Sequence, residues 1–236
     1  MDEFIRPYLL CGENLRPEES AALAGIFRTV LLPPFSKLGA GVRTHADTLF
    51  SDAGEYLVTF SEYYKENEEL FSFIAETGKK LILTDEPVGD KYPDDVLLNG
   101  LFLSEVLYGR TDRLSKLLTG PAGKCEYVRQ GYTRCSVLKV SENAAVTSDR
   151  GIASALVKNG IDVLKISEGN ILLDGFPYGF IGGASFTYEN TVYFFGDLAG
   201  HPDHEAISDF ISRHGRDTVS LSALPLHDIG GGIVIK

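Results

Sequence analysis

Histidine, carboxylate and thiol groups occur in pairs that could transfer protons or attack an electrophile. His45 and Asp47 are two residues apart at the start of a predicted strand. On a strand both side chains would point to one face, as a general base and the acid that orients it would. Cys135 follows Arg134, and this cation, with His45 or His227 nearby, would lower the thiol pKa toward the reactive thiolate. His45 and Cys135 also have a purely structural interpretation. His45 would then be a hydrogen-bonded structural histidine, and Cys135 a small, buried, apolar residue.

Carboxylates and glycines form a second set of candidate ligand-binding residues. Asp94 and Asp95 follow a proline, so they either contact a cationic ligand or only complete a turn. Gly182, Gly183 and the run 230–232 either let a ligand approach the backbone closely or make room where several strands converge.

One segment concentrates potential metal ligands. Asp197, His201, Asp203 and His204 lie close together in the sequence, and a hydrolytic metal centre uses such ligands. Pro202 and Asp203 are also typical of the first turn of a helix, which is the interpretation that we favour, and we predict no metal. The sequence contains no Gly-x-Gly-x-x-Gly, Walker, Gly-x-Ser-x-Gly or His-Glu-x-x-His motif, so no cofactor is predicted either.

The elements that would position these residues repeat five times. A helical pattern ends at a glycine, and a short apolar strand follows within a few residues. The glycines are Gly25, Gly78, Gly123, Gly160 and Gly215, and the strands are predicted over 29–33, 80–84, 125–129, 162–166 and 218–222. Two further strands and a helix recur between the copies. The repeating unit is therefore ββαβ, with a period typical of solenoids and propellers.

The other elements of each unit follow from apolar periodicity. First strands are predicted over 47–50, 95–98, 135–140, 180–186 and 232–235. Second strands are predicted over 55–60, 102–106, 144–147, 191–195 and 8–11. Helices are predicted from Ser61 as N-cap, from Thr111, from Ser148 or Asp149, around Pro202, and over 17–24.

The fifth unit is thus split between the two ends of the chain. A closed ring satisfies every unit without capping repeats, whereas an open solenoid would need polar terminal caps. The alternative is an ordinary α/β sandwich. The chain has no Pro/Ser-rich linker, low-complexity tract or charge block, so we predict a single domain over residues 1–236.

This pattern resembles the guanidino-group-modifying superfamily, also called the pentein or β/α-propeller fold, which includes amidinotransferases and deiminases. Residues 45–50 are similar to the first unit of bacterial arginine deiminases, and residues 230–235 to the Gly-Gly-x-x-Cys end of the deiminases. Residues 179–183 and 196–203 look like a bacterial branch that by itself implies no activity. The resemblance implies an α+β fold, a closed five-unit propeller of ββαβ repeats whose fifth unit is formed by both termini.

The resemblance also implies roles for particular positions. In members with known chemistry, a cysteine attacks the guanidinium carbon, a histidine moves protons, and carboxylates hold the guanidinium nitrogens. Here the cysteine position falls on or beside Ile235, and the histidine position falls within 181–183, so the usual nucleophile and base are missing. Asp47 and either Asp94 or Asp95 occupy carboxylate positions.

The segments that lead into the first strands are expected to line a central channel. Arg134 and Cys135 stand where a deiminase would carry a further carboxylate, and His227 and Asp228 precede the last of these strands. His45 and Cys135 are the candidate catalytic residues. The candidate substrate-binding residues are Asp47, Asp94, Asp95, Arg134, Gly182, Gly183, His227 and Asp228.

We therefore predict a small-molecule-binding protein whose channel ligand is a cationic guanidino, amidino or amino-acid-like compound. Whether it also catalyses a reaction is left open. One alternative is a deiminase-like hydrolase that uses Cys135 or a bound water, with His45 as the base. The other is a structural or interaction protein whose channel is filled by its own side chains.

Composition limits the partners. The chain has 22 Lys and Arg against 33 Asp and Glu, a net charge of −11, and such a surface repels nucleic acid and anionic membranes. We find no signal-peptide pattern and no apolar run of about 18 residues that could span a membrane. The three cysteines show no Cys-x-x-Cys spacing, which favours a reducing cytoplasm. The expected partner is a small molecule, and the oligomeric state is not specified.

Overall fold

The computed structural model describes residues 6–236, and five three-stranded sheets within it share one topology. In each sheet the middle strand pairs antiparallel with one neighbour and parallel with the other. The antiparallel neighbours are β3 (Phe50–Ala53), β6 (Leu101–Leu103), β9 (Val137–Ser141), β12 (Ser185–Tyr188) and β15 (Ile233–Ile235). The middle strands are β4 (Tyr56–Phe60), β7 (Val106–Gly109), β10 (Ala144–Thr147), β13 (Thr191–Phe194) and β1 (Tyr8–Gly12). The parallel neighbours are β5 (Lys80–Thr84), β8 (Lys124–Tyr127), β11 (Asp162–Lys165), β14 (Asp217–Ser220) and β2 (Arg28–Leu32).

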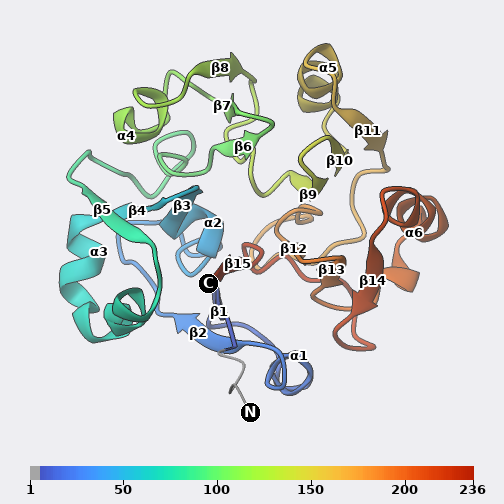
Figure 1. Cartoon of the computed structure of the whole chain (residues 1–236), viewed down its shortest axis with the longest axis horizontal. Coiled ribbons are helices and arrows are strands. Elements are labelled where there is room, and N and C mark those ends of the chain that lie inside the picture. The colour runs from blue at the N-terminus through green and yellow to red at the C-terminus, as the bar shows by residue number, and fades with distance from the viewer. Residues whose placement is uncertain (1–5) are drawn as a thin grey trace.

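Helices connect the middle strand of each sheet to its parallel neighbour. They are α1 (Pro17–Leu23), α3 (Ser61–Glu66) with the 3₁₀ helix η1 (Glu68–Glu76), α4 (Lys116–Thr119), α5 (Arg150–Lys158), and η2 (Leu198–Gly200) with α6 (His204–Arg213). Figure 1 shows the five sheets around the middle of the molecule, with α1, α3, α4, α5 and α6 outside them. The middle strands β1, β7 and β10 are buried along their whole length, whereas the outer strand β14 is exposed. This α+β architecture confirms the predicted ββαβ order.

The two ends of the chain meet in one sheet. Strand β15 pairs antiparallel with β1, placing Ile235 opposite Tyr8 and Ile233 opposite Leu10, and β1 pairs parallel with β2. All four of these side chains are buried. The structure thus confirms that the fifth unit combines the C-terminal strand with the N-terminal strands and α1.

The predicted first strands begin too early in three units. A single helical turn occupies the segment before the strand, as α2 (Ala46–Leu49) in the first unit and as turns at 133–136 and 181–184. In each turn an amide donates to the carbonyl four residues earlier at 3.0 Å: Leu49 to His45, Ser136 to Tyr132, and Ala184 to Phe180. Periodicity does not distinguish one helical turn from the start of a strand in such short segments.

Threonines of the middle strands hold two of these turns in place. Thr59 Oγ1 donates to the carbonyl of Leu49, and Thr147 Oγ1 donates to the carbonyl of Ser136, each at 2.8 Å. Both threonines are fully buried. The two bonds satisfy carbonyl groups at the C-terminal end of a turn, where no further helical residue follows.

The second unit differs most from the prediction. No strand forms over 95–98, and the predicted strand 102–106 spans the end of β6, a turn and the start of β7. Ser104 and Glu105 form that turn with φ of 50° and 63°. A two-residue hairpin turn with positive φ usually carries Asn or Gly, so Ser-Glu gave no turn signal in the sequence.

Helix starts were predicted with mixed success. For α5 the sequence predicted Ser148 or Asp149 as the N-cap. Asp149 is the N-cap, and its side chain accepts a hydrogen bond from the Ile152 amide at 2.8 Å. Ser61, which was predicted as the N-cap of α3, is instead the first residue of that helix. Helix α4 begins after Ser115 rather than at Thr111. Within residues 6–236, no helix combines the length and the apolar character that crossing a bilayer requires.

Removing residues 230–236 should prevent folding into a soluble, cooperatively melting protein. The deletion removes β15, including the fully buried Ile235, and exposes the edge of β1. Burying each Ile side chain contributes about 1.5–3 kcal/mol, a large share of the 5–15 kcal/mol that stabilises a typical domain. Deleting only the exposed Lys236 is the control and should leave the melting curve unchanged. Soluble protein with unchanged melting after the longer deletion would contradict a structural role for β15.

Candidate functional site

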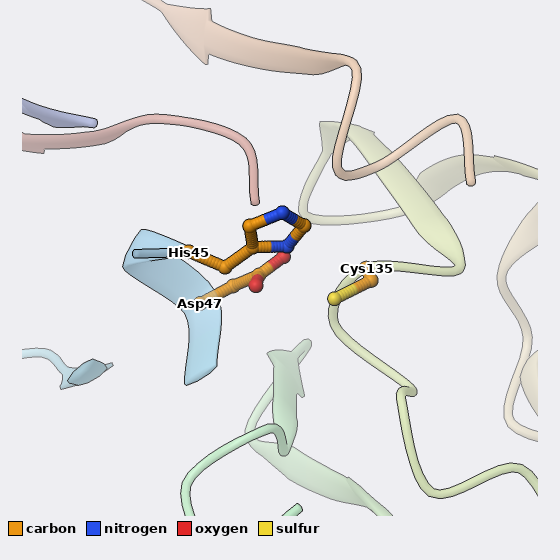
Figure 2. Close-up of side chains that lie close together, drawn as sticks. All are labelled: His45, Asp47 and Cys135. Atoms are coloured by element: carbon orange, nitrogen blue, oxygen red, sulfur yellow. The ribbon is translucent and has the colours of Figure 1, made fainter. Parts of the chain in front are cut away.

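Three buried polar side chains meet near the middle of the molecule. His45 and Asp47 come from α2 and its N-cap, and Cys135 comes from the turn before β9. The exposed fraction is 1% for His45 and Asp47 and 2% for Cys135. One imidazole nitrogen, one carboxylate oxygen and the sulfur lie within 4.8 Å of one another, and Figure 2 shows the three side chains facing one another. The structure therefore brings together three of the residues singled out in the sequence, although α2 replaces the predicted strand.

Asn99, which the sequence analysis did not single out, fixes the segments that carry this cluster. Its Nδ2 donates to the Asp47 carbonyl at 2.8 Å and to the Cys135 sulfur at 3.1 Å. Its Oδ1 accepts from the amides of Arg134 at 2.8 Å and Cys135 at 3.3 Å. Asn99 is fully buried. The only sequence signal was the Asn-Gly pair at 99–100, which is typical of a turn.

Asp228 is a fourth buried polar residue beside the cluster. Its Oδ1 lies 3.7 Å from His45 Nδ1. The same carboxylate accepts hydrogen bonds from the Gly230 amide at 3.0 Å and the Phe180 amide at 2.8 Å. Because two backbone groups hold Asp228, its carboxylate has a fixed position next to the imidazole.

Burial dominates the electrostatics of these four residues. It raises the pKa of Asp47 to about 7, with the charge of Asp228 as the next contribution. It also raises the pKa of Asp228 to about 6 and lowers the pKa of His45 to about 3. Burial, followed by the charges of Asp47 and Asp228, raises the pKa of the Cys135 thiol well above its ordinary value. The chain alone thus favours a neutral imidazole and a thiol, which corrects the expectation that Arg134 and His45 would promote the thiolate.

Several polar atoms of the cluster lack partners. Both ring nitrogens of His45 and both carboxylate oxygens of Asp47 are buried and have no hydrogen-bond partner within the described part of the chain. Buried polar side chains are almost always hydrogen-bonded to protein or to ordered water. Four such atoms within one cluster are therefore available to a bound water, ligand or ion.

Two cavities lie on either side of the cluster. The loop-side cavity has a volume of about 1200 Å³ and is lined by the loops before α2, β6, β9 and β12, together with His45, Cys135 and Asp228. The hairpin-side cavity has a volume of about 560 Å³ and is lined by β3, β6, β9, β12, β15 and their turns, together with Asp47 and Arg134. Since neighbouring members of the cluster line different cavities, the cluster lies between them.

The loop-side cavity is acidic and aromatic. Its charged lining residues are Asp90, Asp95, Asp149, Asp174 and Asp228 against Lys91 and Arg129. Aromatic rings from three units form a continuous wall, with centroid separations of 5.6 Å for Tyr92 and Tyr132, 6.5 Å for Tyr132 and Phe180, and 6.4 Å for Phe180 and Tyr178. Such a lining suits a ligand that is both positively charged and able to contact ring faces.

The two predicted neighbouring carboxylates have different environments. Asp95 has an exposed fraction of 3% and lines the loop-side cavity. The Tyr132 hydroxyl donates to Asp95 Oδ2, whereas the buried Oδ1 has no partner among residues 6–236. Asp94 is exposed, lies outside both cavities and accepts a hydrogen bond from Arg113 at 2.9 Å. Asp95 is therefore the candidate for ligand binding.

The remaining predicted site residues lie at the edges of this arrangement. Arg134 lines the hairpin-side cavity, on the far side of the cluster from Asp95. His227 lines neither cavity, and its Nε2 lies 4.0 Å from Asp174 Oδ2. Gly182 and Gly183 also line neither cavity.

Close packing explains the two glycines. A Cβ atom on Gly182 would lie 2.3 Å from the Val137 carbonyl oxygen, and one on Gly183 would lie 1.9 Å from Asp228 Oδ1. Both positions are therefore occupied by protein atoms rather than by space for a ligand. Of the two interpretations of these glycines, convergence of the backbone is the one that the geometry favours.

The segment around α6 uses its metal-type side chains for hydrogen bonds. Asp203 Oδ2 accepts from the Ser167 amide at 2.6 Å, and His201 Nδ1 accepts from the Asp203 amide at 3.1 Å. Asp197 Oδ1 accepts from the Ala199 amide at 3.0 Å at the start of η2. In the described residues, only His45, Asp47 and Cys135 form a group with the proximity that one metal ion needs.

The chain belongs to a family of unknown function, DUF6873, whose model matches residues 11–233. A search of curated proteins gives no match.

Several solved structures share the fold. An agmatine deiminase from C. jejuni is 12% identical over 92% of this chain and 88% of its own, with a TM-score of 0.57. A dimethylarginine dimethylaminohydrolase (DDAH) from Pseudomonas aeruginosa, complexed with citrulline, is 10% identical over 97% of both chains, with a TM-score of 0.55. An amidinotransferase of the saxitoxin biosynthetic pathway from Microseira wollei is 10% identical over 91% of this chain and 88% of its own, with a TM-score of 0.54. At these identities the likeness establishes the pentein-like fold of guanidino-modifying enzymes and nothing about activity.

Substituting Gly182 by Ala should destabilise the protein, because the new methyl group would meet the carbonyl oxygens of Arg134, Cys135 and Val137 at 2.3–2.6 Å. Backbone atoms move less readily than side chains, so we expect a loss of about 1–3 kcal/mol or more in urea or thermal unfolding. Gly123→Ala is the matched control, since no atom lies within 4 Å of its added Cβ and exposed substitutions usually change stability by less than about 0.5 kcal/mol. Equal stability of the two variants would contradict the packing role of Gly182.

Proposed function

We propose that this chain is a small-molecule-binding protein of the guanidino-group-modifying superfamily, built as a closed five-unit propeller. Its ligand carries a cationic guanidino, amidino or amino group and occupies the loop-side cavity. The names of the fold relatives support the ligand class, because agmatine deiminase, DDAH and amidinotransferase act on guanidino or amidino groups.

The observation that carries this proposal is the state of the Asp95 carboxylate. One oxygen is held by the Tyr132 hydroxyl, and the other is buried in the cavity wall without a partner among the described residues. A buried acceptor without a partner costs about 1–3 kcal/mol. A guanidinium or ammonium group supplies the missing donor and neutralises the charge.

The rest of the cavity favours the same ligand. Aspartates outnumber basic residues in its lining, so the cavity concentrates cations. Tyr132 both positions Asp95 and continues the aromatic wall toward Tyr92 and Phe180. A planar cation bound at Asp95 could therefore stack on a ring while it donates to the carboxylate.

The cluster supports recognition better than covalent catalysis. Cys135 lines the cavity, as a nucleophile would, but burial and the carboxylates around it raise the pKa of its thiol well above the ordinary value. Since the thiolate is the nucleophile, we propose binding without turnover. Citrulline-type products or ammonia formed from arginine, agmatine or dimethylarginine, and lost in Cys135→Ala, would instead support the deiminase-like hydrolase.

Agmatine, arginine or dimethylarginine should raise the melting temperature of the wild-type protein, and Asp95→Asn should weaken this effect. Loss of a charged hydrogen bond of about 1.5–3 kcal/mol corresponds to a roughly 10- to 100-fold weaker affinity. Asp94→Asn is the matched control, because this neighbouring carboxylate lies outside the cavity. Calorimetric titration of the three proteins measures the difference.

Two results would contradict the proposal. If none of the three compounds shifts the melting temperature, the cationic ligand class is wrong, and the alternative of a structural or interaction protein is favoured. If Asp94→Asn weakens binding as much as Asp95→Asn does, the bound cation does not lie at the cavity wall.

The affinity for the cation should increase as the pH rises, and the midpoint of this increase should lie above the ordinary pKa of an aspartate. Burial raises the pKa of Asp95 despite its hydrogen bond from Tyr132. Below that raised pKa the carboxyl is protonated and neutral, so the cation loses its partner, and above it the ionised form binds. Calorimetric titrations between pH 4 and 8 measure this dependence, and Asp95→Asn should reduce it to the contribution of Asp228, which lines the same cavity and has a pKa of about 6. A wild-type affinity that does not change over this range would contradict the role of Asp95.

A further inference from the structure

We propose that His45, Asp47 and Cys135 together bind one zinc ion in the middle of the fold. The three side chains offer an imidazole nitrogen, a carboxylate oxygen and a sulfur. This mixture of borderline and soft donors suits Zn²⁺ better than Mg²⁺ or Ca²⁺, which prefer oxygen ligands alone. The proposal is independent of the cationic ligand at Asp95.

The donor atoms lie near enough to one another to share one metal ion. Tetrahedral zinc with bonds of 2.0–2.3 Å places its ligand atoms about 3.3–3.6 Å apart. The three donors already lie within 4.8 Å of one another. Binding one ion therefore requires the donors to move closer together, and Figure 2 shows the three side chains facing one another.

The donor atoms are free to bind a metal. Neither nitrogen of His45 and neither oxygen of Asp47 has a hydrogen-bond partner in the described part of the chain, although both residues have an exposed fraction of 1%. In a solely structural cluster these atoms would be expected to bond to neighbouring groups. A metal ion satisfies an oxygen, a nitrogen and a sulfur at once.

Two further residues provide the second layer of such a site. Asn99 Nδ2 donates to the Cys135 sulfur at 3.1 Å, a contact that stabilises a thiolate, and also holds the Asp47 carbonyl at 2.8 Å. The Asp228 carboxylate, which two backbone amides hold in place, lies 3.7 Å from His45 Nδ1 and can orient the ring. Outer groups of this kind fix the ligands of most metal sites.

Charge and access also fit an ion at this position. A divalent cation would offset the negative charges that Asp47, Asp228 and a Cys135 thiolate would carry in this buried position once the metal is bound. His45 and Cys135 line the loop-side cavity. The cavity therefore provides an entry path to the cluster, which a metal site requires.

The test is metal binding by the full-length chain. Wild-type protein stripped with a chelator and dialysed against ZnCl₂ should retain one zinc ion per chain by atomic spectroscopy. Replacement by Co²⁺ should produce a thiolate-to-cobalt charge-transfer band. Cys135→Ala should abolish that band, and His45→Gln should weaken Zn²⁺ binding by more than about tenfold.

Cys11→Ala is the matched control, because Cys11 is also fully buried but lies in β1 outside the cluster. It should keep both the zinc content and the cobalt band, while circular dichroism verifies that each variant is folded. Two results on the wild-type chain alone would overturn the proposal: no zinc retained, or a cobalt complex without the thiolate band. An unchanged band in Cys135→Ala would overturn it as well.

Discussion

The structure depends on a ring of hydrogen bonds that joins the five units at the middle of the molecule. The Asp47 carbonyl accepts from Asn99, whose side chain accepts from the Arg134 amide, and the Cys135 carbonyl accepts from the Gly183 amide at 2.9 Å. The ring continues through the Ile229 amide, which donates to the Gly183 carbonyl at 3.1 Å, and closes where the Asp47 amide donates to the Gly230 carbonyl at 3.2 Å. Each bond crosses from one unit to the next, so a fault at one position leaves a buried polar group unsatisfied in its neighbour. This constraint explains why the backbone packs so closely around Gly182 and Gly183.

The residues that form this ring are largely distinct from the loops that line the loop-side cavity. The strands and the single turns before them hold His45, Asp47 and Cys135 in fixed positions, whereas the longer loops build the loop-side cavity. Loops can change without disturbing the hydrogen bonds at the centre, and binding sites are commonly carried by loops on a rigid scaffold. A shared fold at about 10% identity with an agmatine deiminase, a DDAH and an amidinotransferase is consistent with this division.

Much of the architecture could be predicted from the sequence, because apolar runs and helix-ending glycines mark the outer elements clearly. Strands 80–84 and 144–147 were predicted with their observed limits, as was the pairing of the two chain ends. The centre was harder, since a single helical turn and a strand start have the same short pattern of buried residues. His45 and Asp47 were selected by residue type and do lie together, but on α2 rather than on a strand. Asn99 gave no chemical signal, because its importance comes from four contacts between units rather than from its reactivity.

The sequence also could not decide which of Asp94 and Asp95 lines the cavity. Both are acidic and adjacent, and only the direction of the backbone places one in the wall and the other in solvent. The ionisation of the cluster does not change this assignment. With zinc bound, the charges of Asp47, Asp228 and a Cys135 thiolate would exceed that of the ion, and without zinc burial favours protonation of the thiol and raises the pKa of both carboxyls. In neither state does the centre carry a positive charge that would repel a cation from Asp95. In the proposed function, the preference of the cavity for cations would therefore come from Asp95 and the other aspartates of its wall, while the cluster behind them belongs to the framework that holds those residues.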